Sequence, residues 1–227
     1  MSGDNVEIRN GVVSTTPGMA IFAQHAHYLR LIDLRVLETE GIYAVSHAPM
    51  VDRCHIAETR GYALQIGRGG VARNCTITQV EKAVGGGGGT GLQLGTGAAA
   101  IGCTIDYTDY AGIYAHSDAL IQDTRVSHAN REKLSYGGGI LLDGTDVTIR
   151  HCVVSEANGC GILIRPLAIG TVIEETVVRR SAAAAPTIGA GIVCQNNSTT
   201  LRNNQGVFNQ GGFIAGPYVD AGGNTGS

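Results

Sequence analysis

The sequence has no tryptophan, only three phenylalanines and no excess of basic residues. Its 16 Lys and Arg residues against 19 Asp and Glu residues leave a formal net charge of −3. A chain without a basic excess has no electrostatic basis for binding nucleic acid or an anionic membrane surface. No uninterrupted apolar run approaches the roughly 20 residues of a membrane-spanning helix. We therefore expect neither a nucleic-acid partner nor a membrane span.

The sequence also lacks the spacings that hold metals and phosphates. Zinc sites use close pairs such as C-x₂-C, and none occurs among the six cysteines. The glycine run at 85–89 lacks the Asp of calcium-binding repeats and the Gly-Lys-Ser/Thr ending of a phosphate loop. We expect no metal and no cofactor. The first residues are polar, so we also expect no signal peptide in this chain.

What the sequence does contain is a repeat of about 21 residues, marked by a glycine followed by a short apolar strand. Such a period, with some longer members, is typical of a solenoid whose extra residues form loops. We predict one domain over residues 1–227, with loop insertions near 79–90, 127–138 and 179–190. The marker glycines are Gly18, Gly41, Gly61, Gly91, Gly112, Gly139, Gly161, Gly191 and Gly212. We expect many of these glycines to mark turns.

A second strand in each repeat has the pattern apolar-x-x-small-x-apolar. Its small position forms one column with four cysteines: Cys54, Cys75, Cys103 and Cys152. We interpret them as free thiols that act as small core residues. Short strands without helical periodicity exclude a helical solenoid. The predicted fold is therefore all-β: a single-stranded, right-handed parallel β-helix of about nine rungs.

The Gly-Ile-x-x strand followed by apolar-x-x-Cys-x-Ile resembles the repeat of the pectin-lyase-like superfamily. It is similar in particular to uncharacterised bacterial β-helix proteins, many of them exported. The resemblance implies a polysaccharide or oligosaccharide partner and an exported or cell-surface location. It implies either a lyase, epimerase or hydrolase, or a non-catalytic structural or adhesive protein of the surface or tailspike type. The Asp-Asp and Gly-His-Gly elements of polygalacturonases are absent, so whether the chain is an enzyme stays open.

Strand alternation sends the second and fourth residues after each marker glycine outward. The fourth position places His116, Asp143 and Arg165 on consecutive rungs. We expect Arg165 to hold Asp143 ionised, and Asp143 to orient or charge His116. In a lyase or epimerase, His116 or Tyr114 would be the base and Arg165 the cation that binds a uronate. These four are the predicted catalytic residues, and the alternative is a surface ladder of ion pairs.

Polar and aromatic residues on adjoining turns enlarge this cluster. Because tryptophan is absent, tyrosines are the available platforms for stacking against a sugar. The alternative for each residue is a solvated turn position. The predicted substrate-binding residues are Tyr107, Tyr110, Tyr136, Asp106, Asp109 and His128.

The second outward position is apolar on four consecutive rungs: Leu141, Leu163, Val193 and Ile214. A contiguous apolar surface usually marks a contact. Either an insertion such as 179–190 covers it, or another subunit does. We predict a homo-oligomer through this flank, with a trimer favoured.

Overall fold

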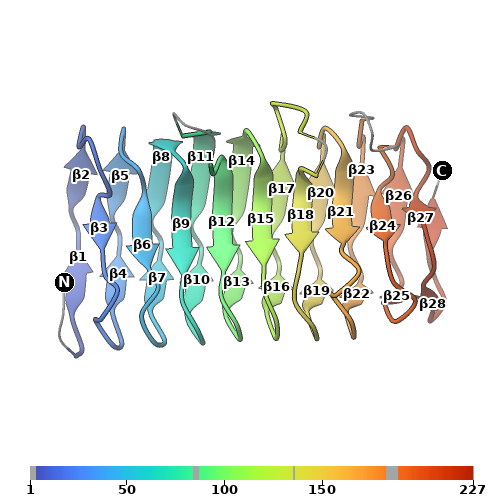
Figure 1. Cartoon of the computed structure of the whole chain (residues 1–227), viewed down its shortest axis with the longest axis horizontal. Helices are drawn as coiled ribbons and strands as arrows, with labels where there is room; N and C mark the ends of the chain where they lie inside the picture. The colour runs from blue at the N-terminus through green and yellow to red at the C-terminus, as the bar shows by residue number, and fades with distance from the viewer. Residues whose placement is uncertain (1–3, 84–86, 135, 183–188, 227) are drawn as a thin grey trace.

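The computed structural model describes residues 4–83, 87–134, 136–182 and 189–226 (Figure 1). In these residues the regular elements are strands, and no helix is long and apolar enough to cross a membrane. The strands form three parallel sheets that extend along the whole elongated molecule, with the two termini at opposite ends. We number them sheets 1, 2 and 3 in the order in which the chain enters them.

Sheet 1 has ten strands in the described residues: β1 (Glu7–Arg9), β4 (Arg30–Ile32), β7 (Met50–Asp52), β10 (Val71–Arg73), β13 (Ala99–Ile101), β16 (Leu120–Gln122), β19 (Thr148–Arg150), β22 (Val172–Glu174), β25 (Thr200–Arg202) and β28 (Val219–Asp220). Sheet 2 has ten: β2 (Val12–Ser14), β5 (Arg35–Leu37), β8 (His55–Arg60), β11 (Thr76–Glu81), β14 (Thr104–Thr108), β17 (Arg125–Ser127), β20 (Val153–Ser155), β23 (Val177–Arg179), β26 (Gln205–Val207) and β29 (Thr225–Gly226). Sheet 3 has nine: β3 (Ile21–Phe22), β6 (Ile42–Ala44), β9 (Tyr62–Ile66), β12 (Thr90–Leu94), β15 (Ala111–Ala115), β18 (Gly138–Leu142), β21 (Cys160–Ile164), β24 (Ile192–Cys194) and β27 (Ile214–Ala215).

The chain passes through sheets 1, 2 and 3 in turn and then begins the next rung. Neighbouring strands in each sheet are parallel and in register, so that Ile77 pairs with both Ile56 and Ile105. Sheets of ten, ten and nine strands in the described residues correspond to about nine complete rungs. The predicted parallel β-helix and its rung number are confirmed.

Each rung turns at three bends, and residues with positive φ recur at each of them. Asp33, Arg53 and Asn74 take this conformation between sheets 1 and 2, which we call the 1–2 bend. The 2–3 bend has Tyr107 and His128 in the same conformation. Asn and Asp tolerate positive φ better than most residues. The backbone amides at the bends still donate to the next rung, as Arg53 N does to Arg73 O at 3.0 Å. The hydrogen bonds between rungs therefore continue through the bend.

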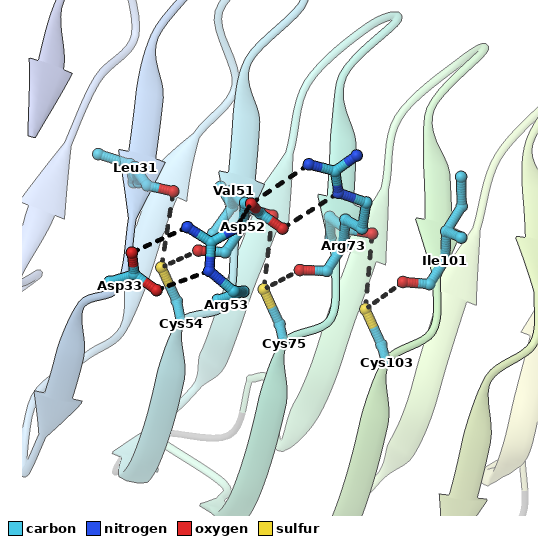
Figure 2. Close-up of polar contacts among 11 residues, drawn as sticks. Leu31, Asp33, Val51, Asp52, Arg53, Cys54, Arg73, Cys75, Ile101 and Cys103 are labelled. Atoms are coloured by element: carbon cyan, nitrogen blue, oxygen red, sulfur yellow. Dashed lines mark hydrogen bonds and ion pairs between the residues drawn. The ribbon is translucent and has the colours of Figure 1, made fainter. Parts of the chain in front are cut away.

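The cysteine column lies where the 1–2 bend enters the core. All six cysteines are free and buried, which was predicted for the four of the column. Each thiol of the column faces the carbonyl two residues before it, at 3.3 Å for Cys75 (Figure 2) and 3.2 Å for Cys152. Burial raises the pKa of Cys152 to about 11, so this thiol stays protonated and can donate. In a later rung Asn204 occupies the position of the cysteines, and its side-chain amide donates to Ile173 O at 2.8 Å.

The marker glycines divide into two kinds, and the expectation of turns was wrong for several of them. Gly41 does have positive φ, at 89°. A Cβ on Gly112, however, would lie 2.2 Å from Val126 Cγ1, and one on Gly139 would lie 2.4 Å from Val154 Cγ1. Glycine is needed at these positions because sheet 3 approaches a β-branched residue of sheet 2 too closely for any side chain.

The register of sheet 3 differs from the sequence alignment at both ends. Phe22 pairs with Tyr43, which in turn pairs with Gln65. Tyr62 is the first residue after Gly61, a position that strand alternation would turn inward, but its side chain is exposed. At the other end Ile214 pairs with Ile192 and packs against the main core. The spacing between glycine and strand shifts by two residues at the N-terminal end and by one at the C-terminal end, which the glycine period alone does not reveal.

Two residues of the apolar flank are buried within the chain itself, without a second subunit. Leu141 and Leu163 are only 0% and 3% exposed. They form a second buried cluster with Ala111 and Cys160, against which Tyr110, Tyr114 and Val193 pack. Ile214 does not belong to this cluster. The trimer therefore stays a prediction and has lost the observation that supported it.

Candidate functional site

Sheet 3 positions the three ionisable residues that the sequence singled out. His116, Asp143 and Arg165 each directly follow a strand, namely β15, β18 and β21. Their amides continue the ladder by bonding to the preceding rung, at 3.0 Å to Leu94 O and 3.1 Å to Ala115 O and Leu142 O. The three side chains therefore start from neighbouring rungs at the same edge of the sheet.

Hydrogen bonds join two of these residues to two tyrosines. Tyr114 Oη donates to Asp143 Oδ2 at 2.6 Å, and Arg165 Nη1 donates to the same oxygen at 3.2 Å. Arg165 Nη2 donates to Tyr110 Oη at 3.3 Å. The Arg165 guanidinium also lies 5.8 Å from the centre of the Tyr114 ring. We call these four side chains the Asp143 network. The side chains of Asp143 and Arg165 are about a third and a quarter exposed, so solvent and ligands can reach the network.

Burial and the bond to Asp143 raise the pKa of Tyr114 to about 12. The phenol therefore stays protonated over the ordinary pH range and acts as a hydrogen-bond donor. This speaks against Tyr114 as the base. Arg165, in turn, already has its charge balanced by Asp143, which weakens the role predicted for it as the cation that binds a uronate.

His116 faces a different neighbour from the one we expected. Its Nε2 lies 3.3 Å from Gln93 Nε2, and its ring is edge-on to Tyr114 with the centroids 5.0 Å apart. The imidazole and the amide are thus within hydrogen-bonding distance of each other. In the described part of the chain, the polar contacts do not join His116 to Asp143. Sequence reasoning did not select Gln93, although it stands in the outward column beside Tyr114.

Three predicted substrate-binding residues lie at the 2–3 bend, which is the opposite end of the sheet 3 strands. Asp106 Oδ1 is 2.8 Å from His128 Nδ1, and His128 Nε2 is 2.8 Å from Glu156 Oε2. Tyr107 stacks on His128 with the ring centroids 4.6 Å apart. Glu156 continues this ladder to Arg180 at 3.3 Å. The structure therefore separates Asp106, Tyr107 and His128 from the Asp143 network.

Asp109 is buried and binds two of the long connections to each other. One carboxylate oxygen accepts from Lys82 N at 2.9 Å, in the 82–89 connection, and the other lies 2.8 Å from Arg131 Nη2, in the 128–137 connection. Its carboxylate is thus engaged within the protein. Tyr136, also in the second connection, is 63% exposed. Of the six predicted substrate-binding residues, Tyr110 is the one that contacts the Asp143 network.

A hollow of about 700 Å³ lies elsewhere, outside the 2–3 bend of the first rungs. It contains none of the predicted site residues. Its acidic lining would repel an anionic polysaccharide. The lining residues are Thr15, Thr16, Pro17, Glu38, Thr39, Glu40, Glu58, Arg60, Gln79, Glu81 and Arg131.

Comparison with solved structures shows the same fold in proteins of very different sequence. Tailspike protein 2 of the Escherichia coli O157:H7 bacteriophage CAB120 aligns with a TM-score of 0.65 and 11% identity, over 99% of this chain and 35% of the tailspike. Pectate lyase Pel9A aligns with a TM-score of 0.62 and 13% identity, over 96% of this chain and 70% of the lyase. At such identities the likeness concerns the fold alone. The chain spans about a third of the length of the tailspike.

No curated protein sequence matches the chain. The sequence model of the family described as the right-handed β-helix region matches residues 84–225. These residues are more than half of the chain and contain the rungs of the Asp143 network. The chain belongs to the family of right-handed β-helix proteins, which have the pectin-lyase-like fold.

Proposed function

We propose that this protein binds a polysaccharide on the outer face of sheet 3, with the Asp143 network as the centre of the site. The observation that carries the proposal is the chain of bonds from Tyr114 through Asp143 to Arg165. Planar polar groups held in place beside tyrosine rings are suited to sugar hydroxyls and to the apolar face of a sugar. The β-helix proteins similar to this chain in structure include a pectate lyase, which supports a carbohydrate ligand.

A catalytic role is the second candidate, and His116 is the residue that favours it. Its Nε2 lies 3.3 Å from Gln93 Nε2, and an imidazole in this place can act as a general base once a ligand displaces the amide. Tyr114 beside it stays protonated and can donate a hydrogen bond. Such a pair fits the lyase or epimerase chemistry expected from the sequence, whereas a structural or adhesive role would require neither residue.

The test is retention of the protein by gels that contain dextran, mannan, galactan, polygalacturonate or alginate. Asp143→Ala removes the shared acceptor of Tyr114 and Arg165, so we expect about a tenfold weaker affinity for the retained glycan, as for the loss of a charge-assisted hydrogen bond. Asp33→Ala is the matched control, because Asp33 also pairs with an arginine, Arg53 at 2.8 Å, but at the 1–2 bend. It should leave binding unchanged.

The same mixtures report catalysis through ultraviolet absorbance from new double bonds and through new reducing ends. A signal lost in His116→Gln with binding intact would support the second candidate. Retention that is equally weakened by Asp143→Ala and Asp33→Ala would contradict the proposed site. The absence of retention by every polysaccharide would favour the structural or adhesive role.

A further inference from the structure

The outward column of sheet 3 continues from Tyr114 toward the N-terminal end of the β-helix. Register pairs Tyr114 with Gln93, Gln93 with Gln65, and Gln65 with Tyr43. Tyr43 pairs with Phe22 in turn. Five consecutive strands thus present an unbroken strip of aromatic and amide side chains, which we call the Phe22–Tyr114 strip. It extends the Asp143 network along the axis of the molecule.

The strip carries aromatic rings at its far end. The rings of Phe22 and Tyr43 are stacked with their centroids 5.0 Å apart and their planes 5° from parallel. Phe22 is 50% exposed. Tyr43 is partly exposed. Such a pair of rings combines a large apolar surface with the tyrosine hydroxyl, a combination suited to the mixed polar and apolar surface of a sugar. Phe22 is the fourth residue after Gly18 and Tyr43 the second after Gly41, so the glycine spacing alone does not pair them.

Amides fill the middle of the strip. Gln65 and Gln93 are partly exposed, and each amide offers both a donor and an acceptor to hydroxyl groups. The residues two positions further along these rungs are glycines, Gly67 and Gly95. A Cβ at either position would lie against the backbone of the preceding rung, 2.3 Å from Ser46 O for Gly67 and 3.0 Å from Ile66 O for Gly95.

The charges along the proposed binding path cancel. The strip itself has no charged residue, and beside it Asp143 and Arg165 neutralise each other. An anionic polysaccharide binds best where cations outnumber anions, and neither the strip nor the Asp143–Arg165 pair offers such an excess. A glycan rich in hydroxyl groups and free of carboxylates matches this path.

We infer that the ligand is an uncharged, linear glycan that extends from the Asp143 network over Gln93 and Gln65 to the Phe22–Tyr43 pair. This inference rests on the proposed function and specifies its ligand. From Arg165 to Phe22 the face spans six inter-strand spacings, or roughly 29 Å at ~4.8 Å each. A glycan of several sugar units is needed to contact both ends.

The test measures affinity for dextran, mannan and their short oligosaccharides, beside polygalacturonate. The double substitution Phe22→Ala with Tyr43→Ala should weaken binding of the long neutral glycan about tenfold and leave a disaccharide unaffected. Added salt should not weaken that binding, because no ion pair forms. Phe208→Ala is the matched control, since Phe208 is 75% exposed at the 2–3 bend, and circular dichroism verifies the fold of each variant.

Three outcomes would overturn the inference, and they are distinguishable from failure of the proposed function. Neutral binding that depends on Asp143 but not on Phe22 and Tyr43 would confine the ligand to the Asp143 network. Tighter binding to polygalacturonate than to any neutral glycan would exclude the uncharged ligand. Self-association that the double substitution abolishes, without glycan retention, would assign the strip to a second copy of the chain. Absence of all glycan binding would refute the proposed function itself, and this inference with it.

Discussion

Gly139→Ala should destabilise the β-helix by about 3 kcal/mol, the upper end of the usual cost of overpacking. The new methyl group would lie 2.4 Å from Val154 Cγ1 and 2.5 Å from Gly161 O. One neighbour is a stiff β-branched side chain and the other is the backbone of the next rung, so neither can move aside cheaply. For a chain of this size, we expect a fall in Tm of roughly 6–12 °C, measured by circular dichroism.

Gly18→Ala is the matched control for this prediction. Gly18 is also a marker glycine, but a Cβ there would meet no atom within 4 Å, and we expect little change in Tm. Val154→Ala in the Gly139→Ala background removes one of the two clashes. The double variant should therefore lose less stability than the two single changes added together, by about 1 kcal/mol. Equal Tm values for Gly139→Ala and Gly18→Ala would show that the glycine is not needed for packing.

Asp52→Asn should cost about 2 kcal/mol near neutral pH, because it removes a buried carboxylate that two arginines share. Asp52 is 2% exposed. It accepts from Arg73 Nε at 3.1 Å and also bonds to Arg53, as Figure 2 shows. Both arginines are about half exposed, which keeps the cost below that of breaking a fully buried ion pair.

The same substitution should remove part of the acid sensitivity of the protein. The hydrogen bond from Arg73 lowers the pKa of Asp52 below its ordinary value of 3.8, although burial opposes this shift. A lowered pKa in the folded state gives stability that is fully present above the unfolded pKa and is lost as pH falls through the folded pKa. Urea unfolding at a series of pH values should show the wild-type and Asp52→Asn curves converging below about pH 4. Curves that stay parallel would show that Asp52 does not contribute this stability.

Asp33→Asn provides the comparison for Asp52. Asp33 bonds to Arg53 through both carboxylate oxygens at 2.8 Å, but its side chain is 41% exposed. Solvent screens such a pair, so the loss of stability should be smaller than for Asp52→Asn. The contrast separates the effect of burial from the effect of pairing with an arginine, since Arg53 is a partner of both residues.

The Asp143 network and the Phe22–Tyr114 strip together describe a face that is partly exposed, neutral and continuous along the helix axis. The strands fix the positions of its side chains because they sit on a hydrogen-bonded ladder rather than on loops. This is the arrangement expected of a surface that holds an extended ligand without reshaping. The acidic hollow at the 2–3 bend is lined by other residues and plays no part in the proposal.

The sequence by itself determined the parallel β-helix, its rung number and the column of buried cysteines. They follow from a repeat and from alternation along short strands. These are local properties, and the sequence of each rung shows them again. It also placed His116, Asp143 and Arg165 on neighbouring rungs, because the rungs from Gly112 to Gly161 keep the same spacing from glycine to strand.

Only the tertiary structure decided which side chains meet. His116 lies beside Gln93, and Asp109 bonds to Lys82 and Arg131. Leu141 is buried in the second apolar cluster. The tertiary structure also brought Phe22 beside Tyr43 by a shift of two residues in the glycine-to-strand spacing. The physical reason is that contacts between rungs depend on register and on how far each side chain reaches across the 4.8 Å step, which the period of a repeat does not specify.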